Sequence, residues 1–553
     1  MKKYILFLTI SILSVSCSLE ENMEGLATRQ TAYDTKDQAQ AVVNKCYTYL
    51  NNFITTNFGL MVEACTDLWY CDTGTVDAYL NINPNNPGQG TTIWNNCYAG
   101  IMCCNEAIEC ILASDKIADE DKYPLQAEAR ALRAFYYYYL TNTFGGVPFY
   151  LYMVADRETQ DKIQLLPRTD ANEIRKTLYE DLRMNAVPYF TEENGLKVRP
   201  SEIKGNRAGY ALSLMLMAKF AMWVADKETY TETSSQKPDV EYWDKAIFAL
   251  EQLEALYGDL QTYPLEQTSW NTKNVPESIF ELQHAWSTTG VQYSSSYGRL
   301  LLPPYTNGKF DGVSMPEIGE NLANWASLRT TDYFIKIKDA KTSTSVFSNP
   351  PLMTSPIDNN LHIDRQAIAE GEVRGEPFDH RLEYVIGFGK LSTGATFKKV
   401  SEGSDAYAGP KFWCNDMVSS YDSNNYKLFR YADAILMLAE CHARSISADL
   451  DTATDYMNMT RVRAGLDPLP SGTYDDSDAF MKELRAERAR ELAGELHRKY
   501  DLVRWDLWYS AVTTYSDFSK LKNNIRECHE YYPIPDTECS LSNYVLTNFA
   551  YNE

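Results

Sequence analysis

Histidine is scarce in this chain of 553 residues, which contains only six, and they lie singly along the sequence. The common catalytic signatures are also missing: there is no His-Glu-x-x-His, no Gly-x-Ser-x-Gly and no glycine-rich phosphate-binding loop. The sequence therefore offers few residues from which a histidine-based metal site or a histidine base could be built. The 75 acidic residues offer many carboxylate pairs, so a glycosidase dyad stays open, but no spacing favours one. We predict a protein that is not an enzyme and needs no cofactor and no metal.

Positive charge is in short supply as well. Lys and Arg total 52 against 75 for Asp and Glu, which leaves a formal net charge of −23. A surface this acidic repels the phosphate backbone of nucleic acids. Nucleic acid is therefore not among the partners that we expect.

Long apolar runs are missing beyond the N-terminus. The richest later stretch, 209–218, has ten uncharged residues and is closed by Lys219. A helix that crosses a bilayer needs about 20 apolar residues, so this stretch fits a buried helix of a globular domain instead.

The N-terminus has the composition of a secretory signal peptide. Two lysines precede an apolar core of about twelve residues, Tyr4–Val15. The core ends at Leu13-Ser14-Val15-Ser16-Cys17, which is similar to a bacterial lipobox although its leucine lies one position early. We predict a signal peptide at residues 1–16 and lipidation of Cys17, with an ordinary signal peptide as the alternative.

The twelve cysteines lack the Cys-x2–4-Cys pairs of a zinc site. With Cys17 set aside, eleven remain, an odd number that fits poorly with a disulfide framework. Cys97 and Cys104, like Cys103 and Cys110, are seven residues apart, which is the spacing of a buried helix face. We interpret the cysteines as small buried apolar residues, while one or two disulfides stay open because an exported chain enters an oxidising compartment.

Helical periodicity is abundant at both ends of the chain. In 124–143, apolar or small residues recur every three or four positions, and Gly145-Gly146-Val147-Pro148 stops the pattern. Ala-rich paired segments of this kind suggest degenerate helical hairpins of the tetratricopeptide type. The predicted helices are Lys36–Ile54, Thr91–Ala113, Pro124–Thr143, Asp170–Ala186, Arg207–Ala225, Tyr242–Tyr257, Tyr426–Ile446, Asp451–Ala464 and Ser477–Gly494.

The helical period is lost in the middle of the chain, where Gly, Pro, Ser, Thr, Asn and aromatic residues dominate. Short strands fit at Ser278–His284 and Arg381–Phe388. Long irregular segments in a compact domain are usually functional.

No clean linker separates the two helical ends, so we predict one mainly α domain over residues 17–553. Its tetratricopeptide-like hairpins, in 30–257 and 426–510, would cradle the loop-rich insertion, 258–425, with its few short strands.

Charge is dense in the run 484–493, which reads Leu-Arg-Ala-Glu-Arg-Ala-Arg-Glu-Leu-Ala. Pairs such as Glu487 with Arg490 are three residues apart, so the plain interpretation is an exposed helix face with side-chain ion pairs. Further along, we expect Arg498 and Arg504 to anchor Asp501 and backbone carbonyl groups.

Several blocks of the sequence resemble the SusD/RagB family, and they occur in the family's order over most of the chain. The final block departs from the usual Gln-Asn-Pro-Gly-Tyr and reads Thr547-Asn548-Phe549-Ala550-Tyr551. The matching blocks are Ala127-Glu128-Ala129-Arg130 through Tyr137, Phe144-Gly145-Gly146-Val147-Pro148, Arg430-Tyr431-Ala432-Asp433 through Glu440, Arg461-Val462-Arg463-Ala464-Gly465-Leu466, Glu487-Arg488 through Arg504-Trp505, and Tyr532-Pro533-Ile534-Pro535.

This resemblance implies a lipid-anchored protein at the cell surface, on the outer membrane of Bacteroidetes. Ser18-Leu19-Glu20-Glu21 is similar to the acidic signal that follows the lipidated cysteine in such proteins. The family implies a partner, a SusC-like TonB-dependent transporter, over whose pore the protein holds a nutrient that is most often a glycan. Since the matching blocks belong to the scaffold, they identify no binding residue.

Aromatic residues are the other abundant class and amount to 13% of the chain. A sugar has an apolar C–H face and a hydroxyl edge, so a site for it combines flat rings with carboxylates, amides or Arg. Two segments, 67–87 and 286–325, supply both. The predicted ligand-binding residues are Asp67, Trp69, Tyr70, Tyr79, Trp286, Tyr293, Tyr297 and Trp325.

Within that set, Trp69 and Trp286 are the predicted stacking plates, because polar residues surround them in the sequence. Trp94 and Trp223 lie in predicted helices and are assigned to the core. The sequence thus favours a glycan-binding protein. A peptide-binding or other nutrient-binding relative on the same scaffold, or a secreted glycosidase, stays as the alternative.

Overall fold

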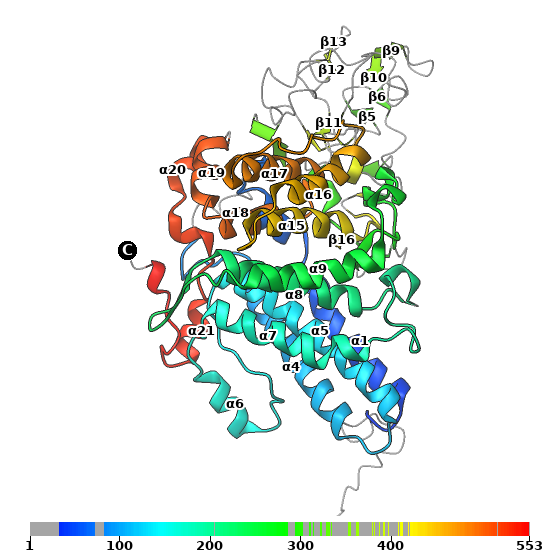
Figure 1. The fold of residues 1–553 in the computed structure, drawn as a ribbon. Helices are drawn as coiled ribbons and strands as arrows, with labels where there is room; N and C mark the ends of the chain where they lie inside the picture. The colour runs from blue at the N-terminus through cyan, green and yellow to red at the C-terminus, as the bar shows by residue number, and fades with distance from the viewer. Residues whose placement is uncertain are drawn as a thin grey trace, which may run out of the picture.

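Figure 1 shows the computed structural model of the chain, in which helices make up most of the described residues. Besides short pieces between residues 309 and 419, the structure describes 32–71, 82–203, 205–285, 294–301, 421–516 and 518–551. Within these ranges no helix has both the length and the apolar composition needed to cross a membrane.

The N-terminal helices pack on one another in chain order. The first long helix packs on α4, α4 on α5, α5 on α7, α7 on α8 and α8 on α9. Two short helices, α2 and α6, lie between the long ones along the chain (Figure 1). The bounds are α1 Lys36–Phe53, α2 Thr56–Glu63, α4 Gly90–Ala113, α5 Asp119–Phe144, α6 Arg157–Gln164, α7 Ala171–Asn185, α8 Tyr210–Asp226 and α9 Tyr242–Tyr257.

The C-terminal helices join this stack through α15, which packs on α9, α16 and α17. The two helical ends of the sequence are therefore neighbours in space, as Figure 1 shows. The bounds are α15 Tyr431–Arg444, α16 Leu450–Arg463, α17 Ser477–Leu492, α18 Arg498–Arg504, α19 Trp508–Tyr515, α20 Ser519–Asn524 and α21 Asp536–Leu541.

Local sequence explains where these helices begin and end. Thr35 caps α1 by accepting a hydrogen bond from the Gln38 amide, and Asp476 caps α17 in the same way at Ala479. Helix α5 ends at Gly145, whose φ of 71° is a conformation that favours glycine. The predicted mainly α fold is confirmed, and eight of the nine predicted helices occur with ends shifted by a few residues.

The ninth prediction, one helix over Tyr426–Ile446, is wrong at its start. Residues Tyr426–Arg430 form a strand, β16, which pairs antiparallel with β4 (Ser278–Leu282), and the helix begins only at Tyr431. Tyr, Leu and Phe favour a strand, and both strands are buried along their whole length. Because β4 lies near the start and β16 just after the end of the insertion, this pair closes the insertion at its base.

A single cluster of buried apolar side chains extends through the described residues from Tyr33 to Leu546. It includes Trp94 and Trp223, each only 4% exposed, as the sequence predicted. The cysteines also lie in or near this cluster. Ten are described, none of these ten is in a disulfide, and the sulfur atoms of Cys46 and Cys103 are 3.3 Å apart.

Candidate functional site

The structure describes part of the predicted ligand-binding face. Asp67, Trp69, Tyr70 and Tyr297 are described, whereas four other predicted residues and the predicted lipidation site lie outside the described residues. These are Tyr79, Trp286, Tyr293, Trp325 and Cys17. Figure 1 places the short strands of the insertion, such as β9 (Leu352–Thr354) and β10 (Leu361–Ile363), beyond α17 at the far end from α6.

Trp69 lies inside the molecule. Trp69 and Tyr70 form a short strand, β1, that pairs antiparallel with β8 (Arg329–Thr330), and the Trp69 ring meets Phe334 edge to face at 5.5 Å. The Trp69 side chain has no exposed surface, and Tyr70 is 3% exposed. The expectation that Trp69 stands open as a stacking plate is therefore wrong: its polar neighbours in the sequence are themselves buried, so they do not mark a surface loop.

Asp67 is an internal anchor. Both of its carboxylate oxygens accept hydrogen bonds from Arg498, at 2.8 and 2.6 Å, and the two residues are 431 positions apart in the chain. This bidentate pair joins the segment before β1 to α18. The expectation that Arg498 anchors a backbone carbonyl is confirmed, since it donates to the carbonyl oxygen of Arg485 at 2.9 Å. The expectation that it anchors Asp501 is wrong, because Arg488 holds that carboxylate, at 2.9 Å from its Nε.

Arg504 differs from the prediction as well. Its guanidinium donates to both carboxylate oxygens of Glu440 at 2.7 Å and to Asp226 at 2.8 Å. Arg504 thus joins α18 to α15 and to the end of α8.

Tyr297 is buried at the base of the insertion. Its ring contacts Trp270, Tyr426 and Phe412, with centroid separations of 5.1, 5.7 and 6.4 Å, and its hydroxyl donates to the carbonyl oxygen of Gly494. The other face of the ring covers Gly59, where a Cβ atom would collide with it. Tyr297 therefore closes the core beneath the insertion and presents no ring to a ligand.

A stacked pair of tyrosines on this side, Tyr333 and Tyr515, was not predicted from the sequence. Tyr333 stacks on Tyr515 at the end of α19, with ring centroids 4.0 Å apart, and Tyr515 is 38% exposed. Tyr333 follows β8, which pairs with the strand that holds Trp69. The insertion is thus fixed to the helices by β1, β8 and this stacked pair.

The charged run in α17 is buried, which overturns its interpretation as an exposed face. Three of its side chains, Glu487, Arg490 and Glu491, belong to a group that we term the buried ion cluster, in which each carboxylate contacts at least two basic groups. Arg430, for example, lies 2.8 Å from Glu277 and 2.7 Å from Glu491. The members are Glu277, Arg381, Lys411, Arg430, Arg463, Glu487, Arg490, Glu491 and Glu495.

Electrostatics keep Glu487 and Glu491 ionised. Burial alone would raise the pKa of Glu487, but Arg381 and Arg490 outweigh burial and hold its pKa at about 2. Glu491 follows the same pattern, with its pKa lowered by Arg463 and Arg430 against the effect of burial. Such groups neither give up nor take up protons near neutral pH, so the cluster acts as an internal frame that joins β4, β16, α16 and α17.

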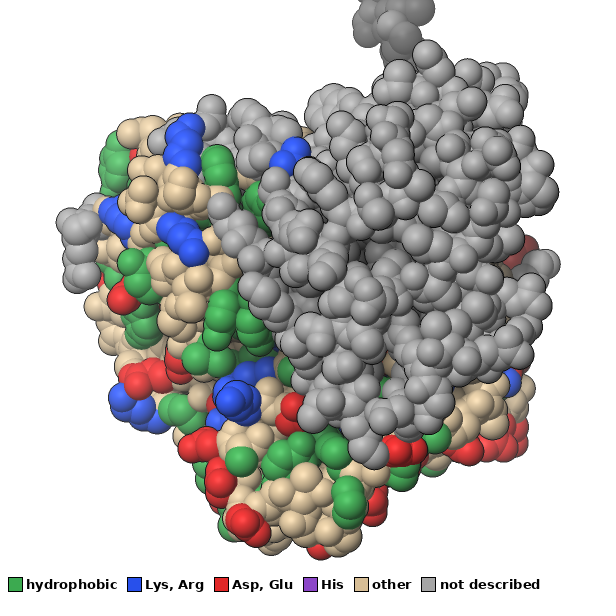
Figure 2. Space-filling model, turned by 90° about the horizontal axis from the view of Figure 1, so that it is seen from above, with side chains coloured by type: hydrophobic (Ala, Val, Ile, Leu, Met, Phe, Trp, Pro, Cys, Tyr) green, Lys and Arg blue, Asp and Glu red, His purple; other side chains and the backbone are tan. Residues whose placement is uncertain are grey.

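Basic side chains on the surface are scattered. On the face seen in Figure 2, the described Lys and Arg side chains lie in small separate groups between apolar and acidic ones. Within the described residues, no group of three or more His, Cys, Asp or Glu has the arrangement of a metal site.

Comparison with known proteins identifies the family. A model of the SusD family matches residues 411–551, and a second model, described as starch-binding associating with outer membrane, matches residues 20–202. The chain belongs to the SusD/RagB family. Both matched parts of this SusD/RagB chain contain helices of the stack described above, and residues 203–410, with α8, α9 and most of the insertion, lie between them.

Relatives with the same fold extend over nearly the whole chain. A SusD-like protein of Formosa agariphila is 25% identical over 99% of this chain and 97% of its own. Two solved structures share the fold: a SusD homolog from Bacteroides thetaiotaomicron, 18% identical with a TM-score of 0.68, and the surface glycan-binding protein A of Bacteroides uniformis, 20% identical with a TM-score of 0.66. They cover 93% of this SusD/RagB chain each, and 97% and 100% of their own lengths.

Proposed function

We propose that this SusD/RagB chain is a non-catalytic glycan-binding protein of the cell surface that passes oligosaccharides to a TonB-dependent transporter of the outer membrane. The observation that carries the proposal is the shared fold with a protein named for surface glycan binding, over 93% of this chain. The family model described as starch-binding, which matches residues 20–202, also supports the proposal.

The ligand is proposed to bind on the insertion side. Trp286, Tyr293 and Trp325, with Tyr79, are the remaining candidates for ring contacts with a sugar. Trp69 and Tyr297 are proposed to support this side from within, since the structure buries both.

A glycan array probed with the chain lacking residues 1–17 would identify the ligand class. Calorimetry with the best oligosaccharide would then compare the wild type with Trp286→Ala and Trp325→Ala. Each substitution is expected to weaken binding by about 1–3 kcal/mol with little change in melting temperature. Phe248→Ala is the matched control, because Phe248 is 53% exposed on α9. Unchanged affinity in both variants would overturn the placement of the site on the insertion side. A peptide as the best ligand would favour the alternative, a peptide-binding protein on the same scaffold.

Absence of catalysis is part of the proposal, because the sequence contains none of the common nucleophile–base or metal signatures. The best-binding oligosaccharide should be recovered uncut after incubation with the protein. New reducing ends that disappear on substitution of a Glu or Asp would place the chain among the glycosidases.

Attachment to the membrane is proposed to depend on Cys17. Replacing Cys17 by Ala should move the protein from the membrane fraction to the soluble fraction and abolish labelling with palmitate. Continued labelling of the variant would show that the lipid is attached elsewhere.

Transfer to a transporter predicts a physical complex. Affinity purification of the tagged protein from its own cells should recover an outer-membrane TonB-dependent transporter in near-equal amount. Recovery of the protein alone in mild detergent would contradict the proposed transfer to a transporter, while the proposed glycan binding would stand.

A further inference from the structure

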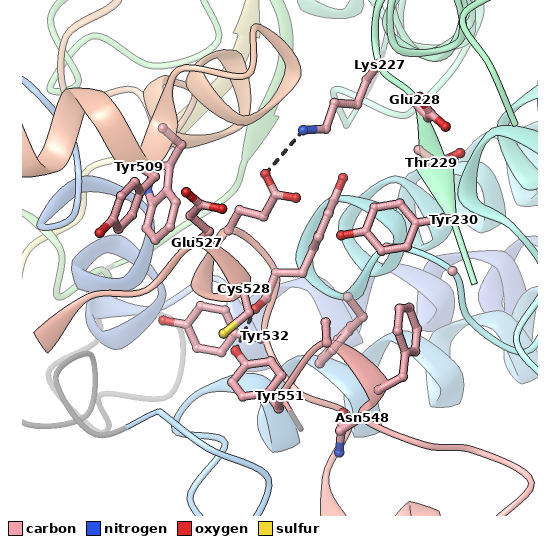
Figure 3. A pocket seen from close by; sticks show the side chains of 18 of the residues that line it. Lys227, Glu228, Thr229, Tyr230, Tyr509, Glu527, Cys528, Tyr532, Asn548 and Tyr551 are labelled. Carbon is pink, nitrogen blue, oxygen red and sulfur yellow. Dashed lines mark hydrogen bonds and ion pairs between the residues drawn. The ribbon is translucent and has the colours of Figure 1, made fainter. Parts of the chain in front are cut away.

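An open cleft of about 800 Å³ is lined largely by C-terminal residues, among them Tyr509, Glu527 and Tyr551. Figure 3 shows it from close by. Its walls come from several parts of the chain: the end of α5 with Gly145 and Gly146, Arg168, β2 (Thr229–Tyr230), the start of α19, and the last segment with its two 3-10 helices, Glu527–Glu530 and Phe549–Tyr551. A volume of this size is within the range of roughly 300–1,000 Å³ that is usual for small-molecule sites.

The backbone around the cleft is fixed by hydrogen bonds. Arg168 donates to the carbonyl oxygens of Gly146, Phe144 and Thr547, at 2.8, 2.6 and 3.1 Å. These bonds tie the last segment to the loop after α5. The cleft is thus formed before any ligand arrives, which lowers the entropic cost of binding.

Bonds within the last segment fix the other wall. The Tyr551 hydroxyl donates to the Tyr531 carbonyl oxygen at 2.7 Å, and the Tyr532 amide donates to the carbonyl oxygen of Thr143 at 2.6 Å. The rings that line the cleft therefore stand on a rigid support.

Aromatic rings give the cleft its apolar surface. Tyr230 and Tyr509, which are 46% and 37% exposed, lie on opposite sides in Figure 3. The Tyr230 ring meets Phe549 at 5.8 Å, and the Arg168 guanidinium lies 5.1 Å from the Phe549 ring centre. Phe549 occupies the position at which the final family block usually has proline, so this chain has added a ring to the cleft.

The charges in the cleft favour a ligand without negative charge. Four carboxylates line it against two basic side chains, and one of these, Lys227, is paired with Glu530 at 3.2 Å and with Asp506. An anionic ligand would face an excess of two negative charges, whereas a neutral hydroxyl group can donate to a carboxylate oxygen. Flat rings beside carboxylates are the combination that suits a sugar.

We propose that this cleft is a second saccharide-binding site, which takes neutral oligosaccharides and rejects sulfated or uronic ones. Tyr230, Tyr509 and Phe549 supply the ring contacts, and the carboxylate of Glu527 accepts hydrogen bonds from the sugar. The site is separate from the one proposed on the insertion side, so either can exist without the other.

Hydrogen exchange measured by mass spectrometry on the mature full-length chain tests both sites at once. The probes are maltoheptaose and laminarihexaose as neutral oligosaccharides, and an oligogalacturonate as the anionic one. Each neutral probe at saturating concentration is expected to slow exchange in peptides that contain residues 527–532 and 547–551. Protection limited to peptides within 286–325 would overturn the second site and leave the first. Protection limited to the peptides of the cleft would support the second site and overturn the site on the insertion side. Equal protection of the cleft by oligogalacturonate would contradict its preference for neutral oligosaccharides.

Substitutions then assign the contacts. Tyr230→Ala and Phe549→Ala are each expected to raise the dissociation constant at the cleft by about tenfold or more, while affinity on the insertion side stays the same. Phe248→Ala, on the surface of α9 outside the cleft, is the control and should change neither the affinity at the cleft nor the affinity on the insertion side. Folding of each variant is checked by its melting temperature, and unchanged affinity in both folded variants would overturn the proposal.

Discussion

Glu63 is a carboxylic acid in the interior, at the end of α2. One of its oxygens accepts a hydrogen bond from the Leu496 amide at 2.7 Å, and the other, Oε2, is buried without a partner among the residues that the structure describes. Burial raises the pKa of Glu63 to about 8, against the lowering effect of the Leu496 hydrogen bond and of Lys411. Glu63 is therefore protonated in the native protein at neutral pH.

The raised pKa makes the stability of the protein depend on pH at this position. Since the folded-state pKa lies above the unfolded one, the stabilisation is full below about pH 4.5 and is lost as the pH rises through 8. Glu63→Gln removes this titrating group. The free energy of unfolding of the variant, relative to that of the wild type, should therefore rise by a few kcal/mol when the pH is raised from 6 to 9. Urea denaturation at both pH values measures this gain, and an equal difference at both would contradict the raised pKa.

Trp69 belongs to the core, so its truncation should cost stability. Trp69→Ala is expected to lower the free energy of unfolding by about 3–5 kcal/mol. Trp69→Phe is the matched control and should cost less, because the indole Nε1 is buried without a hydrogen-bond partner in the described residues. Thermal unfolding measures both variants. A loss of glycan affinity in Trp69→Ala, with the melting temperature unchanged, would contradict the buried position.

The site could be predicted from the sequence only in part, and single residues show why. Aromatic rings between polar residues suggested an open loop at Trp69, but Asp67 finds its partner Arg498 at the other end of the chain. A polar residue with a distant partner looks the same in a sequence as one in water. Trp94 and Trp223 were predicted correctly because the helical period around them is a local signal.

Among the elements, β16 and α17 depend on one side chain. Arg430 donates hydrogen bonds to Glu277, Glu491 and Glu495, and it thereby joins β16 to the segment before β4 and to the end of α17. All four side chains are fully buried.

Removing this guanidinium would leave three carboxylates short of a partner. Arg430→Met is therefore expected to lower the free energy of unfolding by about 3–5 kcal/mol. Arg157→Met is the control: Arg157 pairs with Asp161 on the surface of α6 and is 83% exposed, so its loss should not be measurable. Denaturation in urea compares the two, and equal stability of Arg430→Met and the wild type would show that the cluster adds nothing to stability.

The same elements show what the sequence reveals about the fold. Helices such as α9 and α16 were predicted from apolar spacing and caps, which act within a few residues. The strand β16 was missed because it pairs with β4, about 150 residues earlier in the chain. The burial of α17 was missed because spacing of Glu487 and Arg490 by three residues is identical on exposed and on buried helices.

Across the whole molecule, buried histidines set the response to acid. Burial lowers the pKa of His497 to about 3, and it lowers those of His284 and His529 to about 4. Because these folded-state values lie below the unfolded value of about 6.5, the unfolded chain binds more protons at pH 5. Acidification therefore favours unfolding over the window from about pH 6.5 to pH 4.

The protein should be less stable at pH 5 than at pH 7. Three such histidines outweigh the opposite effect of Glu63, and the net loss is about 3 kcal/mol from these groups. Guanidinium denaturation at the two pH values measures the loss. In Glu63→Gln the decline should be steeper, since the opposing group is gone, and a protein equally stable at both pH values would contradict the prediction.

The hydrogen bonds between Asp67 and Arg498 can form only late in the synthesis of the chain. The chain must grow by 431 residues before the partner of Asp67 exists, which takes roughly 20–90 s at about 5–20 residues per second. Glu63 waits about as long for the Leu496 amide, and Thr143, near the end of α5, waits somewhat less long for the amide of Tyr532. During this interval the early helices lack these contacts with the C-terminal segments, so the packing of the two helical ends on each other is completed only near the end of synthesis.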